Sequence, residues 1–154
     1  MATLGVSLIA ALLNIVVPSN GPASSAPVAP CALLTQAQVN AALGVTAGPG
    51  QGSAKLCRWG EPGAAGARKA VVVTLQDAQA FAFAKAPSSS THTVKTPASG
   101  IGDDAVYVTI TGVTSTLTVK KGDVYFEVHV YGLADAETKA VEKTIALDVI
   151  TKLQ

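Results

Sequence analysis

The chain has 154 residues, enough for one domain with a modest hydrophobic core. Eleven basic and ten acidic residues leave it nearly neutral, and no Lys or Arg precedes Lys55. Because nucleic acids and anionic membrane surfaces attract clustered positive charge, the composition excludes both as predicted partners.

The N-terminal segment has the pattern of an export signal. Leu4 to Val17 form an apolar run as long as the hydrophobic region of a signal peptide and too short to span a bilayer comfortably. Gly21 and Ala23 occupy the small-residue positions that a signal peptidase reads. No Lys or Arg precedes the run, so a retained apolar arm is the alternative, and only this arm would contact a membrane. We predict a leader over residues 1–26 and a single domain over 27–154, exported to the periplasm, the cell envelope or the extracellular space.

The two cysteines, Cys31 and Cys57, are predicted to form a disulfide. An export signal and the absence of a third thiol favour this pairing. The chain-entropy account gives a bridge of this length about 3–4 kcal/mol. The alternatives are two free thiols in a reducing compartment and a lipoprotein with an acylated Cys31, which Pro30 directly before it disfavours. A metal site is not predicted, because two cysteines without a nearby His cannot fill a tetrahedral shell.

Capping signals predict the first two helices. Thr35 can cap a helix that Gln38 supports in a capping box, and Gly44 supplies a left-handed stop. Asp77 is predicted to cap a second, Ala-rich helix that Pro87 stops.

A third helix, capped by Asp135, is predicted to be amphipathic and to close the chain. Its apolar stripe recurs at intervals of four residues and comprises Val141, Ile145, Val149 and Leu153. Its opposite side is predicted to face water and comprises Lys139, Glu142, Lys143 and Lys152.

Alternating or β-branched runs predict five strands. These cover residues 55–59, 70–75, 106–110, 116–120 and 124–131. The last three are expected to form an antiparallel meander, because glycine turns lie between them. Residues 87–99 are polar and irregular, and they are predicted to form a mobile surface loop.

The last strand decides the predicted architecture, because its two faces differ in character. Val124, Phe126, Val128 and Val130 are expected to pack against the final helix. We therefore predict an α+β two-layer sandwich, a curved antiparallel sheet of about five strands with the helices on one face.

Two further features of the sequence are candidate sites. Asp103 and Asp104 follow a glycine-rich segment, but two adjacent carboxylates fall short of the six or more oxygen ligands of Ca²⁺. We expect a tight turn that enters a strand, in which one Asp bonds local backbone N–H groups. Trp59 is expected in the core because of its large apolar area, with an exposed anchor in a binding groove as the alternative.

Short motifs spread over most of the chain suggest a family. They are the leader, CALLT from Cys31, ALGV at 42–45, CRW from Cys57, GIGDDA at 100–105 and a Lys-Gly-Asp turn. Together they resemble a family of small exported lipoproteins with uncharacterised domains, best known from actinobacteria, over Cys31 to Leu153. The resemblance implies an extracytoplasmic location, a disulfide between the two matching cysteines and no established catalytic activity. The sequence departs from the family at Pro30, where lipidation favours a small residue.

The other face of the last strand is the predicted contact surface. It carries Tyr125, Glu127, His129 and Tyr131, and Tyr107 is placed beside them. Aromatic, amphipathic surface suits partner binding, so we expect an exported, non-catalytic binding module of the bacterial cell envelope without a cofactor. Its partner would be an envelope protein or a small ligand. The alternatives are a structural envelope protein and a small extracytoplasmic hydrolase in which His129 and Glu127 work with an acidic group such as Asp104.

Overall fold

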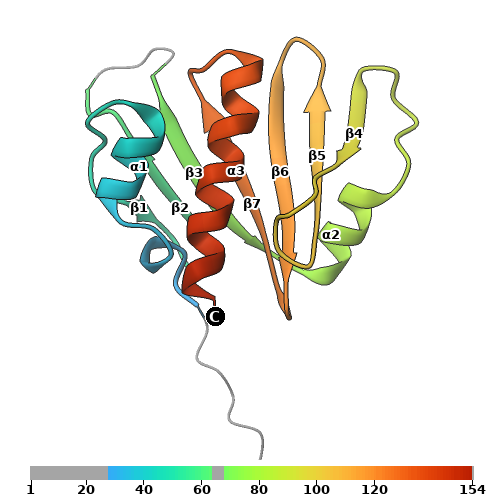
Figure 1. The fold of residues 1–154 in the computed structure, drawn as a ribbon, viewed down its shortest axis with the longest axis horizontal. Coiled ribbons are helices and arrows are strands. Elements are labelled where there is room, and N and C mark those ends of the chain that lie inside the picture. The colour runs from blue at the N-terminus through green and yellow to red at the C-terminus, as the bar shows by residue number, and fades with distance from the viewer. Residues whose placement is uncertain (1–27, 64–67, 154) are drawn as a thin grey trace, which may run out of the picture.

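The computed structural model describes residues 28–63 and 68–153, so the predicted leader lies outside the described residues. Within them the chain forms a seven-stranded antiparallel sheet in the order β1-β2-β3-β7-β6-β5-β4, with three α-helices (Figure 1). The strands are β1 (Gln51–Gly52), β2 (Leu56–Gly60), β3 (Ala70–Gln76), β4 (Thr93–Pro97), β5 (Asp104–Ile110), β6 (Thr114–Lys121) and β7 (Val124–Tyr131). The helices are the short 3₁₀ helix η1 (Pro30–Ala32), α1 (Gln36–Leu43), α2 (Ala78–Lys85) and α3 (Asp135–Lys152).

The α+β class is confirmed, but the sheet has seven strands rather than about five. The two additional strands, β1 and β4, form its edges. The prediction of an irregular loop is wrong for residues 93–97, which pair antiparallel with β5 from Thr93 opposite Ile110 to Pro97 opposite Val106. This strand has one large apolar side chain, Val94, so it lacks an alternating apolar pattern, and backbone pairing alone defines it.

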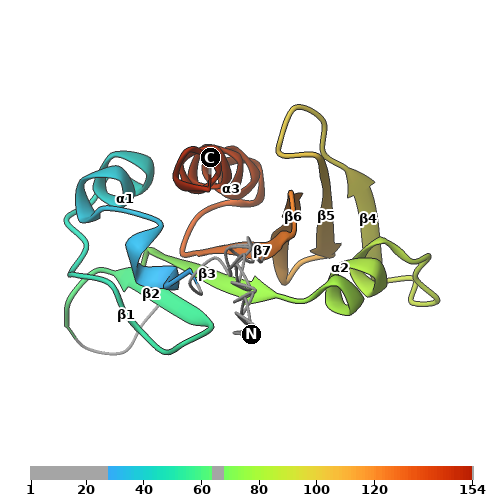
Figure 2. The same ribbon diagram turned by 90° about the horizontal axis from the view of Figure 1, so that it is seen from below.

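The helices lie on both faces of the sheet, which corrects the prediction of a single helical layer. Figure 2 shows α1 and α3 above the sheet and α2 below it. The Phe81 ring of α2 lies 5.5 Å from the ring of Tyr125, whereas the next residue, Phe126, belongs to the core beneath α3. The strand order requires a crossing between β3 and β4, because β7, β6 and β5 lie between them, and α2 makes this crossing on the face away from α3. We call the two surfaces the α3 face and the α2 face.

The main core lies on the α3 face. Val124 is half-buried there and Phe126, Val128 and Val130 are buried, as predicted for the strand that packs against the final helix. Trp59, with 1% of its surface exposed, belongs to the same core, so its prediction as a core residue is confirmed. Each large apolar side chain buried here contributes about 1.5–3 kcal/mol of transfer free energy.

Helix α3 sits deeper in the curved sheet than its sequence predicted. Its buried residues are Thr138, Glu142, Ile145, Ala146, Val149 and Ile150. Glu142 was predicted to face water, and this is wrong, because its exposed fraction is 0%. A spacing of four residues drifts around a helix of 3.6 residues per turn, so the buried stripe alternates steps of four and three. The cap prediction is also wrong: Ala134 is the N-cap, and Asp135 is the first helical residue.

The other capping predictions are confirmed. Thr35 and Gln38 form a complete capping box at α1, and Gly44 ends that helix at φ 66°. Asp77 accepts a hydrogen bond from the backbone N–H of Ala80 at 2.8 Å at the start of α2.

The predicted Cys31–Cys57 disulfide is present and joins η1 to β2, with the two Cα atoms 5.1 Å apart. Within residues 28–63 and 68–153, no helix has the length and apolar character needed to cross a membrane.

Candidate ligand groove on the α2 face

Four of the five predicted contact residues share the α2 face. Tyr125, Glu127 and His129 are partly buried there, while Tyr131 at the end of β7 is 42% exposed. Tyr107 lies on the opposite face, where its hydroxyl donates to the backbone oxygen of Lys139 in α3 at 3.1 Å. The pairing of Tyr107 with Leu117 fixes this orientation, because directly opposite residues in an antiparallel pair share a face.

Neighbouring side chains hold Glu127 in position on β7. Gln76 Nε2 donates to Oε2 of Glu127 at 2.7 Å, and Thr118 Oγ1 donates to Oε1 at 3.4 Å. Thr118 lies directly opposite Glu127 on β6, and residue 127 pairs on its other side with Thr74 of β3. Side chains from β3 and β6, the two strands that flank β7, therefore hold the carboxylate in place.

His129 belongs to a stack at one end of the same face. Its ring lies 4.2 Å from the ring of Tyr131 in a stacked arrangement, and the guanidinium of Arg58 lies 5.5 Å from the Tyr131 ring. Nε2 of His129 is hydrogen-bonded to the hydroxyl of Thr114. Burial lowers the pKa of His129 below its usual value, so the imidazole is neutral at neutral pH.

A groove of about 420 Å³ lies between α2 and the α2 face of the sheet. We call it the α2 groove. It is lined by Phe83, Ala84, Pro87, Ser88, Ser89, Thr93, Lys95, Val108, Ile110, Thr116 and Glu127. Val108 on β5 pairs with Lys95 on β4 and with Thr116 on β6, and the three residues form one row of the groove floor.

Phe83 is the most exposed large apolar side chain among the described residues. Its exposed fraction is 78%, and it lines the α2 groove. Phe81, two positions earlier, is buried against the sheet. Because successive residues on a helix are 100° apart, two aromatic residues at this spacing cannot both face the sheet. That spacing was the sequence signal for an exposed Phe, and the sequence interpretation missed it.

Lys95 lines the groove, but its ammonium is engaged by α2. It donates to the backbone oxygens of Phe83 at 2.9 Å and Ala86 at 2.7 Å, and it lies 5.3 Å from the centre of the Phe83 ring. A lysine in this position satisfies the last carbonyl groups of a helix and complements the negative end of its dipole. Lys95 therefore fixes the end of α2 against β4.

The hydrolase hypothesis receives little support from these contacts. His129 is bonded to Thr114, whereas Glu127 is bonded to Gln76 and Thr118. Asp104 is ion-paired with Lys85. Across residues 28–63 and 68–153, no carboxylate is hydrogen-bonded to His129, and no cluster of three or more His, Cys, Asp or Glu side chains could hold a metal ion.

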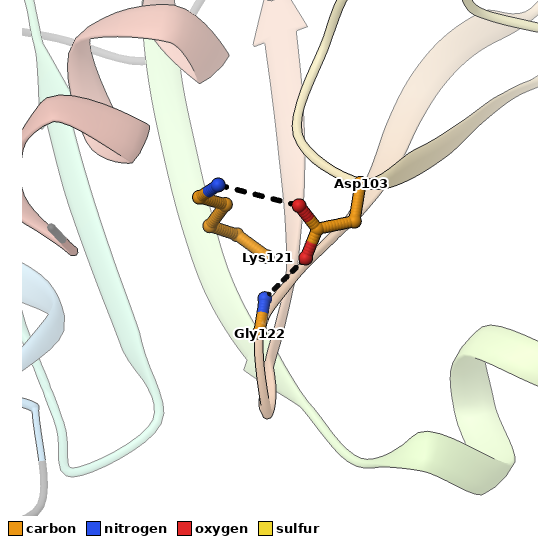
Figure 3. A network of polar contacts seen from close by, with 3 residues as sticks. All are labelled: Asp103, Lys121 and Gly122. Atoms are coloured by element: carbon orange, nitrogen blue, oxygen red, sulfur yellow. Dashed lines mark hydrogen bonds and ion pairs between the residues drawn. The ribbon is translucent and has the colours of Figure 1, made fainter.

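Asp103, directly after the glycine-rich segment, is bonded to Lys121 at the end of β6 and to Gly122 in the turn that follows it (Figure 3). The Asp103 carboxylate accepts hydrogen bonds from the backbone N–H of Gly122 at 2.6 Å and from Lys121 Nζ at 3.2 Å. The bond from Gly122, followed by that from Lys121, lowers the pKa of Asp103. Gly102 is required at φ 58°, because a Cβ there would lie 2.4 Å from the backbone oxygen of Lys120. The expected turn is present, but the expectation of a local backbone partner is wrong, because Gly122 is 19 residues from Asp103 in the sequence.

Glu142 is a titratable group remote from the groove. Burial is the main cause that raises its pKa from 4.5 to about 8, against the opposing effects of Ser115, the Val130 backbone and Lys139. Neither carboxyl oxygen has a partner at hydrogen-bonding geometry among the described residues. A carboxyl group in this environment is protonated at neutral pH.

Two other hollows are less suited to recognise a ligand. One of about 640 Å³ is lined by six glycines and prolines between Gly48 and Gly63 together with Gln51, Leu56, Arg58 and Glu61, and it has no aromatic side chain in its lining. Another of about 330 Å³ lies between α1 and α3 and is lined mainly by small side chains. The α2 groove differs from both by combining a large exposed aromatic side chain with a positioned carboxylate.

Comparison with family models, with curated proteins and with solved structures finds no match to this chain. The likeness to small exported lipoproteins therefore stays a prediction.

Proposed function

We propose that this chain is an exported, non-catalytic domain of the bacterial cell envelope that binds a small ligand in the α2 groove. The observation that carries the proposal is Phe83, a large aromatic side chain that is 78% exposed at the wall of a groove whose floor includes Val108 and Ile110. An exposed apolar patch beside a concave surface is typical of a binding site.

The size and chemistry of the groove support a small molecule as the occupant. Its volume of about 420 Å³ lies within the range of ligand sites in proteins. Val108 and Ile110 supply apolar floor, while Glu127 and Thr116 supply polar groups that can orient a ligand. The lining is divided about evenly between apolar and polar side chains, so it offers both apolar contact and polar groups that fix the orientation of a ligand.

The disulfide supports export as part of this proposal. Cys31–Cys57 is a bond that persists in oxidising compartments and is rare in the cytosol. The bridge also ties the segment that follows the predicted leader to β2, and so to the main core.

A titration with phenylbutanol, a neutral apolar probe, tests the proposal. We expect ¹⁵N chemical-shift changes at the residues that line the α2 groove, measured on the folded chain. Phe83→Ala should weaken binding by about tenfold, because it removes the main apolar contact surface. Leu147→Ala, which truncates a 40% exposed side chain on α3, is the control and should leave binding unchanged. Shifts confined to other surfaces, or none at all, would contradict the proposal.

A further inference from the structure

We propose that the ligand of the α2 groove is an organic cation, with an apolar body on Phe83, Val108 and Ile110 and an ammonium or guanidinium group paired with Glu127. This inference rests on the proposed function and adds the charge of the ligand. It follows from the hydrogen bonds that the two ionisable side chains of the groove, Lys95 and Glu127, already make.

The positive group of the groove is already satisfied. Lys95 donates to two backbone oxygens at the end of α2, those of Phe83 and Ala86. Drawing its ammonium toward an anionic ligand would leave both helix-terminal carbonyls without this donor. The groove therefore offers little to an acidic ligand.

The negative group is positioned but not neutralised. Glu127 accepts one short hydrogen bond from Gln76 and one long bond from Thr118, both neutral donors. A carboxylate has about four lone-pair sites, so it can still accept from a cation. The ion pairs among the described residues are Lys85–Asp104 and Lys121–Asp103, and Glu127 takes part in neither.

The arrangement also sets the shape of the ligand. Val108 lies on β5 and Glu127 on β7, two strand spacings or about 10 Å apart across the sheet, and they are also offset by two positions along the strands. A ligand that reaches both must carry its charge at one end of an elongated apolar body. A phenylalkylamine has this form, because an alkyl chain separates its aromatic ring from its ammonium group.

The test compares phenylbutylamine with phenylbutanol, which has the same apolar body and no charge. We expect the amine to bind at least about tenfold more tightly, because hydrogen bonds to charged groups are the stronger class. Glu127→Gln should lower the affinity for the amine to that for the alcohol and leave the alcohol unchanged. Glu137→Gln, at an exposed position on α3, is the matched control and should change neither affinity.

The outcomes separate the two proposals. If both probes bind in the groove with equal affinity, or if Glu127→Gln leaves the affinity for the amine unchanged, the proposal of a cationic ligand is wrong. The proposal that the groove binds a ligand is then retained. If neither probe shifts groove resonances, both proposals fail. If Glu127→Gln does not fold, the salt dependence of binding to the wild-type chain is the test. Raising the ionic strength should lower the affinity for the amine and leave the affinity for the alcohol unchanged. Equal salt dependence of the two probes would overturn the inference.

Discussion

The two faces of the sheet are built from the same strands but differ in how deeply their side chains are buried. On the α3 face, side chains such as Phe126 and Val128 are fully buried beneath α3. On the α2 face, the alternate residues of the same strand, Glu127 and His129, are only partly buried, and an eight-residue helix covers only part of that face. We infer that the α3 face determines stability and that the α2 face, including its groove, is available for binding.

The largest expected effect is on the α3 face. Phe126→Ala should lower the free energy of unfolding by about 3–5 kcal/mol, because it opens a cavity beneath α3. Chemical denaturation followed by tryptophan fluorescence measures this loss through the buried Trp59. A loss below about 1 kcal/mol would mean that the α3 face is not the main core.

The disulfide is expected to contribute nearly as much as Phe126 to the free energy of unfolding. Cys57 is buried in the core on that face, and its bridge to Cys31 closes a loop with a sequence separation of 26. Replacing both cysteines by Ala should cost about 3–4 kcal/mol relative to the oxidised chain. Reductant should destabilise the wild type similarly and leave the double variant unchanged. A reductant effect on the double variant would show a cause other than this bridge.

Glu142 makes the stability of the α3 face depend on pH. Its pKa of about 8 in the folded chain lies above the ordinary value of 4.5, so the folded state binds the proton more tightly. The contribution of Glu142 to the free energy of unfolding is therefore highest below about pH 4.5, falls as the pH rises, and is lowest above about pH 8.

Glu142→Gln should remove this dependence, because glutamine cannot ionise. At pH 7 the variant should be more stable than the wild type by about 3 kcal/mol, and the two should converge below about pH 4.5. Denaturation at a series of pH values measures the difference. Tyr107 and Lys139, the titratable groups close to Glu142, are unchanged in the variant. A variant that is less stable at pH 7 would contradict a protonated carboxyl group.

The smallest expected effect on stability is on the α2 face. Phe83→Ala removes a side chain that is 78% exposed, so the free energy of unfolding should change by no more than about 0.5 kcal/mol. A loss comparable to that of Phe126→Ala would remove the distinction between the two faces.

Local sequence signals predicted the parts of the fold that depend on neighbouring residues. The capping box at Thr35, the meander turns and the alternation along β7 are properties of a few consecutive side chains. The Cys31–Cys57 bridge was predictable because two cysteines allow one intramolecular pairing.

The groove could not be predicted in the same way, because it depends on non-local placement. Thr93–Pro97 becomes a strand only through pairing with β5, and that pairing makes Lys95 and Val108 neighbours. The position of α2 below the sheet depends on which edge β4 occupies. Burial of Glu142 likewise depends on which side of α3 is turned toward the sheet, and this rotation is set by tertiary packing.

The most direct test of the distinction between the faces is the affinity of folded Phe83→Ala for phenylbutylamine. We predict that binding weakens by about tenfold or more while the free energy of unfolding stays at the wild-type value. Unchanged affinity in a folded variant would contradict the account, because the α2 groove would then not be the place where the ligand binds.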